Sequence, residues 1–135
     1  LGADRREFAR PAAALEWLEE IGLRYELVRE GPVLRVVIYA FPVPNGYNVD
    51  RVDVNVRIET GYPDSQIDMA YFHPALARVD GRAIGALCSD GFDGKTWQRW
   101  SRHRTPANPW RPGIDNLATH FGLVESWLTR ELAKG

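Results

Sequence analysis

The sequence predicts an α+β fold in which helices pack on one face of an antiparallel sheet. A helix pattern comes first, four strand patterns joined by short turns follow, and a second helix pattern comes last. Because no helical segment separates one strand from the next, the strands should form an antiparallel meander, and a doubly wound α/β topology is excluded. The 135 residues are enough for one domain, residues 1–135, around a single core.

The first helix is expected from Pro11 to about Ile21, with Gly22 ending it. Leu15 and Leu18 recur at helical spacing, while the neighbouring glutamates fall on the other side. Proline is well tolerated in the first helical turn because its missing N–H has no partner there. The segment therefore reads as an amphipathic helix that packs on the sheet.

Four strands are expected at residues 24–29, 33–41, 52–59 and 67–72. Residues 52–59 alternate strictly between apolar and polar side chains, so one face of this strand should be buried and the other exposed to solvent. Turns at Gly31-Pro32, at residues 42–48 and at Tyr62-Pro63-Asp64 separate the strands. Short turns of this kind join antiparallel neighbours.

Residues 74–112 show little regular pattern and are expected to form a long irregular segment. This segment holds three of the five tryptophans and the only cysteine, Cys88. Long ordered loops in compact domains are usually functional. A last helix is expected from residue 113 or 114 to about 132, with an apolar stripe formed by Ile114, Leu117, Phe121, Val124, Leu128 and Leu132.

Composition and charge exclude several classes of protein. Apolar residues make up 44% of the chain and charged residues 26%, which is typical of a globular protein. The 17 basic and 18 acidic residues give a net charge of −1, with no overall attraction to nucleic acid or an anionic membrane. One cysteine excludes an internal disulfide, and no apolar run reaches about 18 residues, so we expect a cytoplasmic protein that spans no membrane.

Four strings of residues are distinctive. They are G-Y-P-D at 61–64, D-M at 68–69, G-K-T-W-Q-R-W-S-R-H at 94–103 and W-R-P-G-I-D at 110–115. With the order of elements, they resemble prokaryotic family E of the ubiquitin-conjugating (UBC) superfamily, over roughly residues 18–132. The resemblance implies a short UBC-like fold: an N-terminal helix, a four-stranded antiparallel meander, a long irregular active-site segment and one C-terminal helix.

The resemblance also implies partners. These are a ubiquitin-like protein, a ThiF-type activating enzyme and, in the same pathway, often a JAB-type metalloprotease. No cofactor is implied. A metal site built from Cys88 with His73, His103 and His120 is not expected, because their spacing matches no familiar ligand pattern.

In ubiquitin-conjugating enzymes the catalytic cysteine typically lies in G-x-aliphatic-C-x-D, and residues 85–90, G-A-L-C-S-D, fit that string. The resemblance implies that Cys88 accepts the modifier's C-terminus as a thioester and passes it to an amine. Asp90 would orient the amine, and His103 or a backbone N–H would polarise the carbonyl. The residues expected to bind the modifier are Trp97, Arg99, Trp100, Ser101, Arg102 and Trp110.

Each of these residues has a plainer interpretation. Cys88 lies among small and polar residues, which favours an exposed thiol, and Arg82, Lys95 or His103 are candidates for a nearby positive charge. The alternative is an incidental free thiol. The alternative for Asp90 is that it is a turn residue. The alternative for His103 is that its ring makes a structural hydrogen bond that fixes the long loop.

Three classes of function stay open. The first is the enzyme described above. The second is a non-catalytic adaptor, favoured by Ala75 after His73-Pro74, where ubiquitin-conjugating enzymes carry His-Pro-Asn with an asparagine that supports the oxyanion. The third is a nucleic-acid binder using the tryptophans and arginines of residues 97–111, but the net acidic chain favours a small core of arginines stacked on tryptophans instead. His73 is expected to pack at a strand end, and His120 to be structural.

Overall fold

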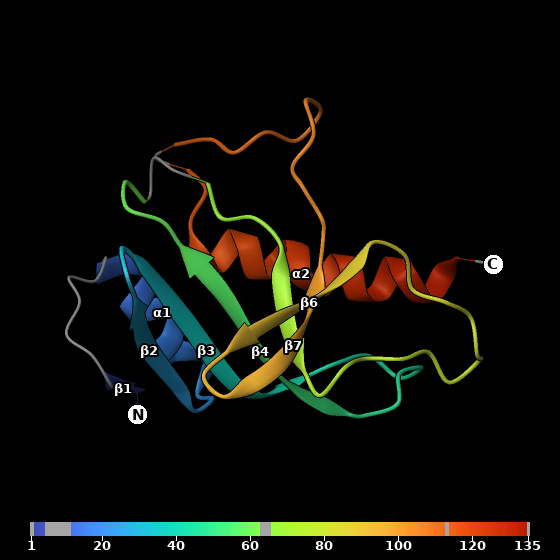
Figure 1. Ribbon diagram of the computed structural model, residues 1–135. Helices are drawn as coiled ribbons and strands as arrows, with labels where there is room; N and C mark the ends of the chain where they lie inside the picture. Colours follow the sequence, from blue (N-terminus) through green and yellow to red (C-terminus); the bar gives the residue numbers. More distant parts are fainter. Residues whose placement is uncertain (1, 5–11, 63–65, 113, 135) are drawn as a thin grey trace.

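The computed structural model describes residues 2–4, 12–62, 66–112 and 114–134, with side chains from residue 15 onward (Figure 1). It contains two helices, α1 (Ala12–Ile21) and α2 (Leu117–Ala133). The strands are β1 (Gly2–Asp4), β2 (Tyr25–Glu30), β3 (Val33–Pro42), β4 (Arg51–Ile58), β5 (Ala70–His73), β6 (Leu87–Phe92) and β7 (Lys95–Trp100). They form one sheet in the order β1-β2-β3-β4-β5-β7-β6.

The α+β class and the four-stranded meander are confirmed, because β2, β3, β4 and β5 pair antiparallel with their neighbours in chain order. The expected strand count of four is wrong. Six strands, β2 to β7, are antiparallel, and the short β1 adds a parallel pairing with β2. The two extra antiparallel strands, β6 and β7, lie in the segment that was expected to be irregular.

The β6–β7 hairpin has one clear signal in the sequence, the turn between its strands. Asp93-Gly94 joins the two strands, and both residues have positive φ, 55° and 74°. A two-residue turn with two positive φ angles matches the right-handed twist of paired strands, and Asp-Gly is one of its preferred sequences. Residues 87–100 are therefore a hairpin rather than a loop.

The other boundaries differ by a few residues. The helix α2 begins at Leu117 rather than at residue 113 or 114, because the Asn116 side chain accepts a hydrogen bond from the Thr119 N–H and caps the helix there. The strand β5 begins at Ala70 rather than at residue 67. The predicted helix start at Pro11 and the turn residues Pro63 and Asp64 lie outside the described residues.

The main core lies between the sheet and the helices. Both helices lie behind the sheet in Figure 1, and Trp17 of α1 stacks on Phe121 of α2 with 5.2 Å between ring centroids. Alternate residues of the central strands point into this core, including Val54 and Val56 of β4. The alternation predicted for this strand is confirmed in part, since Asn55 is also buried on the opposite face.

The opposite face is covered by the sheet itself. In a flat sheet, β3 and β6 would lie about 19 Å apart, four strand spacings of about 4.8 Å. Instead the side chains of Arg35 in β3 and Asp90 in β6 are in contact, with 3.2 Å between Nη1 of Arg35 and Oδ2 of Asp90. The sheet therefore curls so that the hairpin crosses in front of it (Figure 1). A second buried cluster fills this concave side: Val28, Val37, Tyr71, Phe92 and Trp97.

Candidate functional site

Cys88 lies in β6, the strand at the edge of the sheet. The thiol is free and the residue is exposed. Among the residues that the structure describes, β6 pairs with β7 alone, so one side of the strand that carries Cys88 faces outward. The exposure expected from its small and polar neighbours is confirmed.

Arg99 is the charged neighbour of Cys88. Counting back from the Asp93-Gly94 turn places Arg99 directly opposite Cys88 in the ladder. The hydrogen bond to Cys88, and then the negative charge of its thiolate, raise the pKa of Arg99 above the ordinary value. None of the three candidates named from sequence, Arg82, Lys95 and His103, has a contact with the thiol among the interactions found. Arg99 is therefore the positively charged neighbour of the Cys88 sulfur.

Asp90 shares a face of β6 with Cys88, two residues further along. Its Oδ2 accepts a hydrogen bond from Arg35 Nη1 at 3.2 Å, and Arg35 also binds Glu30 and Asn55. The Arg35 side chain is only 4% exposed, so this contact ties the hairpin to the concave side of the sheet. Asp90 is thus a structural contact as well as a candidate for orienting an amine.

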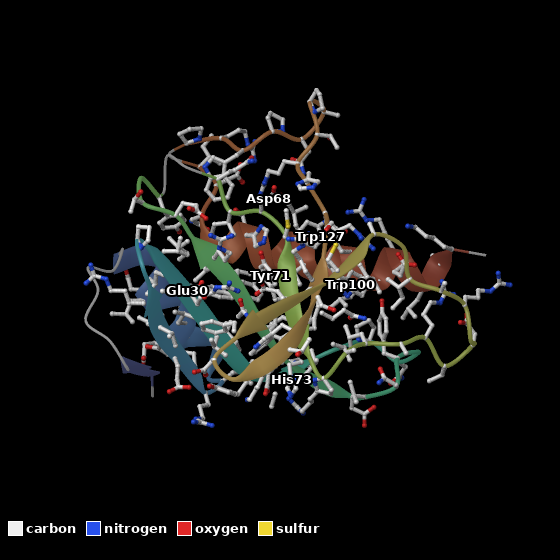
Figure 2. The ribbon with its side chains drawn as sticks, in the orientation of Figure 1. Glu30, Asp68, Tyr71, His73, Trp100 and Trp127 are labelled. Atoms are coloured by element: carbon white, nitrogen blue, oxygen red, sulfur yellow. The ribbon has the colours of Figure 1, made fainter. Side chains whose placement is uncertain are left out.

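His103 lies beyond the end of β7, and its partner is Asp68. The distance from His103 Nδ1 to Asp68 Oδ2 is 2.7 Å, and since a carboxylate only accepts, the imidazole donates from Nδ1. Its side chain is 58% exposed. Asp68 and His73 lie at opposite ends of β5 in Figure 2. Cys88 and His103 share no contact among the described residues.

The tryptophans of the W-Q-R-W string are interior residues. Trp97 packs in the concave cluster and Trp100 in the main core, where it meets Phe72 edge-on at 5.4 Å. Both are almost fully buried, so the expectation that they contact a modifier needs correction: they support the hairpin from within. Alternation along β7 places them on opposite faces, so the curl of the sheet buries Trp97 and the main core buries Trp100.

The remaining candidates are Ser101 and Arg102, directly after β7, and Trp110, further along the chain. Arg102 lies over the Trp100 ring at 4.9 Å and binds the buried Glu131 of α2 at 3.3 Å. The Ser101 N–H donates to the Ala86 carbonyl at 3.0 Å. Trp110 is half-buried and contacts Tyr62. The predicted stacking of arginines on tryptophans is confirmed for Arg102.

A hollow of about 270 Å³ borders the hairpin. It is lined by Ala75, Leu87, Cys88, Ser89, Thr96, Trp97 and Gln98. Ala75 lies here at the place where ubiquitin-conjugating enzymes carry the asparagine of His-Pro-Asn. Ala75 and Cys88 thus line the same hollow, and Ala75 brings no side-chain amide to it.

The other two histidines are packed, as expected from sequence. His73 ends β5, with its ring 5.7 Å from the Trp97 ring. His120 is buried in α2, and its Nε2 lies 2.8 Å from the Met69 carbonyl oxygen. Burial lowers the pKa of His120 to about 4, so the ring is neutral near neutral pH.

Sequence reasoning missed two pairings. Arg99 was predicted to bind the modifier, not to neighbour the thiol, and Asp68 was not assigned to His103. The Asp-Gly turn carried the signal for the first, because it fixes the ladder and with it the residue opposite Cys88. No local pattern predicts the second, because Asp68 and His103 are 35 residues apart.

Comparison with protein-family models decides the family. The model for prokaryotic E2 family E matches residues 11–131. The chain belongs to this family. E2 is the class of ubiquitin-conjugating enzymes, so the family indicates a function in ubiquitin-like conjugation, and a ubiquitin-like protein and an activating enzyme as partners. Searches among curated proteins and solved structures gave no significant match.

Within the described residues, no three histidine, cysteine or acidic side chains are grouped as metal ligands would be. No helix in the described part of the chain is long and apolar enough to cross a membrane.

Proposed function

We propose that this family E protein is a conjugating enzyme whose acceptor is Cys88. The thiolate attacks the thioester between a ubiquitin-like protein and a ThiF-type activating enzyme. A carbon–sulfur bond to Cys88 forms as the bond to the activating enzyme's cysteine breaks, and the proton given up by Cys88 goes to the departing thiolate. Splitting acyl transfer into two such steps lowers each barrier.

In the second step, an amine of the target attacks the thioester on Cys88. The carbon–nitrogen bond forms, the bond to Cys88 breaks, and the amine's extra proton leaves through a nearby base. Asp90 is the candidate for orienting the amine, since it projects from the same face of β6 and uses Oδ2 for Arg35. A JAB-type metalloprotease acting on the product remains a prediction.

The observation that carries this proposal is the pair formed by Cys88 and Arg99. A catalytic cysteine needs access to its partner and a group that favours the thiolate. Cys88 is exposed on an edge strand, and Arg99 stands opposite it. For polarising the carbonyl, a backbone N–H of β6 is a better candidate than His103, because the imidazole is held by Asp68.

The test is reconstitution. The protein is mixed with its activating enzyme, its ubiquitin-like protein and ATP, and separated on a non-reducing gel with and without added thiol. We expect a thiol-labile conjugate with the parent protein and Asp90→Ala, and none with Cys88→Ala. A conjugate that survives thiol but not strong base would instead place the acceptor on a serine such as Ser89 or Ser101.

The second candidate is a non-catalytic adaptor that binds the ubiquitin-like protein or the activating enzyme. The observation that favours it is Ala75, which lines the hollow together with Cys88 and supplies no side-chain amide where ubiquitin-conjugating enzymes carry an asparagine. An adaptor would co-elute with the ubiquitin-like protein in the same mixture, without any conjugate. The two candidates therefore give different results in one experiment.

A further inference from the structure

We propose that the free edge of β6 binds the extended C-terminal tail of the ubiquitin-like protein as an added antiparallel strand, which brings the tail's last residue to Cys88. This inference rests on the proposed function and names how the partner is held. Adding a strand to an exposed sheet edge is a recurring way to bind an extended peptide.

The hairpin geometry shows which groups of β6 are open. Antiparallel neighbours alternate between hydrogen-bonded and non-hydrogen-bonded pairs. A two-residue turn closes on a bonded pair, here Phe92 with Lys95, so Asp90 and Cys88 also point their backbone groups at β7. The bond from the Ser101 N–H to the Ala86 carbonyl, 3.0 Å, keeps this alternation.

The backbone groups of the alternate residues point outward. These are Leu87, Ser89 and Gly91, and Ser89 and Gly91 are exposed. No further strand of the described chain lies on this side of β6. Natural edge strands are usually protected by proline, lysine or a covering segment. In β6 the only charge, Asp90, is directed at Arg35, so the edge offers a row of unpaired donors and acceptors.

The direction of the added strand follows from where the open edge lies. On the N-terminal side of Cys88, only Leu87 of β6 points its backbone groups outward. Toward the turn, Ser89 and Gly91 remain open. A tail that uses these two residues and ends at Cys88 runs from the turn toward Leu87, antiparallel to β6.

The register explains why the tail should end in glycine. The backbone groups of Cys88 point at β7, so Cys88 forms a non-hydrogen-bonded pair with the added strand. Facing Cα atoms in such pairs are about 4.5 Å apart, closer than in bonded pairs. A tail residue without a side chain lets its carbonyl carbon approach the sulfur most closely.

The first test uses a synthetic thioester and needs no activating enzyme. The probe is acetyl-Thr-Val-Thr-Val-Gly-Gly as a mercaptoethanesulfonate thioester, and acylation of Cys88 is followed by intact mass and reversed with thiol. One version is N-methylated at the third residue, whose N–H would face Gly91. Its matched control is N-methylated at the fourth residue, whose N–H would face solvent.

We expect the unmethylated and fourth-residue peptides to acylate Cys88 at similar rates. The third-residue peptide should be about 5-fold slower or more, the equivalent of one lost hydrogen bond of roughly 1 kcal/mol. Equal rates for all three peptides would overturn strand addition while leaving Cys88 as the acceptor. If none acylates a thiol that iodoacetamide still alkylates, the proposed function fails together with this inference.

The second test changes the protein. Ser89→Pro removes an outward N–H that has no partner in the hairpin, whereas Ser89→Ala keeps that N–H and removes only the hydroxyl. Ser89→Pro should be acylated by the unmethylated peptide at least about 5-fold more slowly than Ser89→Ala. Urea unfolding and the iodoacetamide rate identify proteins that keep the fold and the open thiol. A folded Ser89→Pro protein that is acylated as fast as Ser89→Ala would refute the inference.

Discussion

At the scale of single residues, the site depends on a cross-strand neighbour. Cys88 and its exposure could be predicted from the G-A-L-C-S-D string. The charge beside it could not be assigned while residues 74–112 were taken as irregular, because a loop has no ladder to count along. Once the hairpin is known, counting residues back from the Asp93-Gly94 turn along both strands places Arg99 opposite Cys88. Its charge is the property to test.

Replacing Arg99 should slow reactions of the thiolate. In Arg99→Gln the sulfur loses the neighbouring positive charge, so we expect alkylation of Cys88 by iodoacetamide near neutral pH to fall severalfold. Lys95→Gln is the matched control, since it removes a positive charge from the same strand, opposite Phe92. Equal rates for Arg99→Gln and Lys95→Gln would show that Arg99 does not act on the thiol.

His120 should make stability depend on pH. Its pKa is about 4 in the folded protein and near the ordinary 6.5 when unfolded. Between these values the unfolded chain binds a proton that the folded chain does not, so the free energy of unfolding falls as pH drops from 6.5 to 4. The loss should be on the order of 3 kcal/mol.

Urea unfolding of His120→Gln and the parent protein measures this effect. The variant should lose most of the parent's pH dependence in that range, and His103→Gln, which changes an exposed ring, should keep it. A parent protein whose stability is unchanged between these pH values would contradict a buried neutral His120.

At the scale of elements, local sequence patterns predicted the helices and strands whose formation depends on neighbouring residues. Both helices and the four strands of the meander were recovered within a few residues, because each has a continuous period or turn. The start of α2 was placed too early because apolar Ile114 fits the helical stripe, whereas the Asn116 cap sets the true boundary. The hairpin was not predicted, because β6 is mostly exposed and its residues do not alternate between apolar and polar side chains.

The Asp93-Gly94 turn should be sensitive to substitution. Gly94 has a φ of 74°, a conformation that costs other L-residues about 1–2 kcal/mol. A Cβ at Gly94 meets no atom within 4 Å, so the loss in Gly94→Val should come mainly from the backbone. Gly91→Val is the control, since Gly91 has open space and no positive φ. Urea unfolding should show a loss of about 1–2 kcal/mol for Gly94→Val alone.

At the scale of the whole molecule, the curl of the sheet builds the site. It brings Asp90 from the edge strand to the buried Arg35 of β3 and encloses the second cluster. The contact between Arg35 and Asp90 joins residues 55 positions apart. These contacts could not be predicted from sequence, because they follow from strand order and curvature rather than any local pattern. They hold the hairpin in place while leaving Cys88 and the outer edge of β6 open.

The most direct test of the central claim is to locate the bond. The conjugate formed with activating enzyme, ubiquitin-like protein and ATP is quenched in acid, digested and analysed by mass spectrometry. We predict that the modifier's C-terminal residues are attached to the peptide containing Cys88 and are released by thiol. An unmodified Cys88 peptide, or attachment at another side chain, would contradict the account.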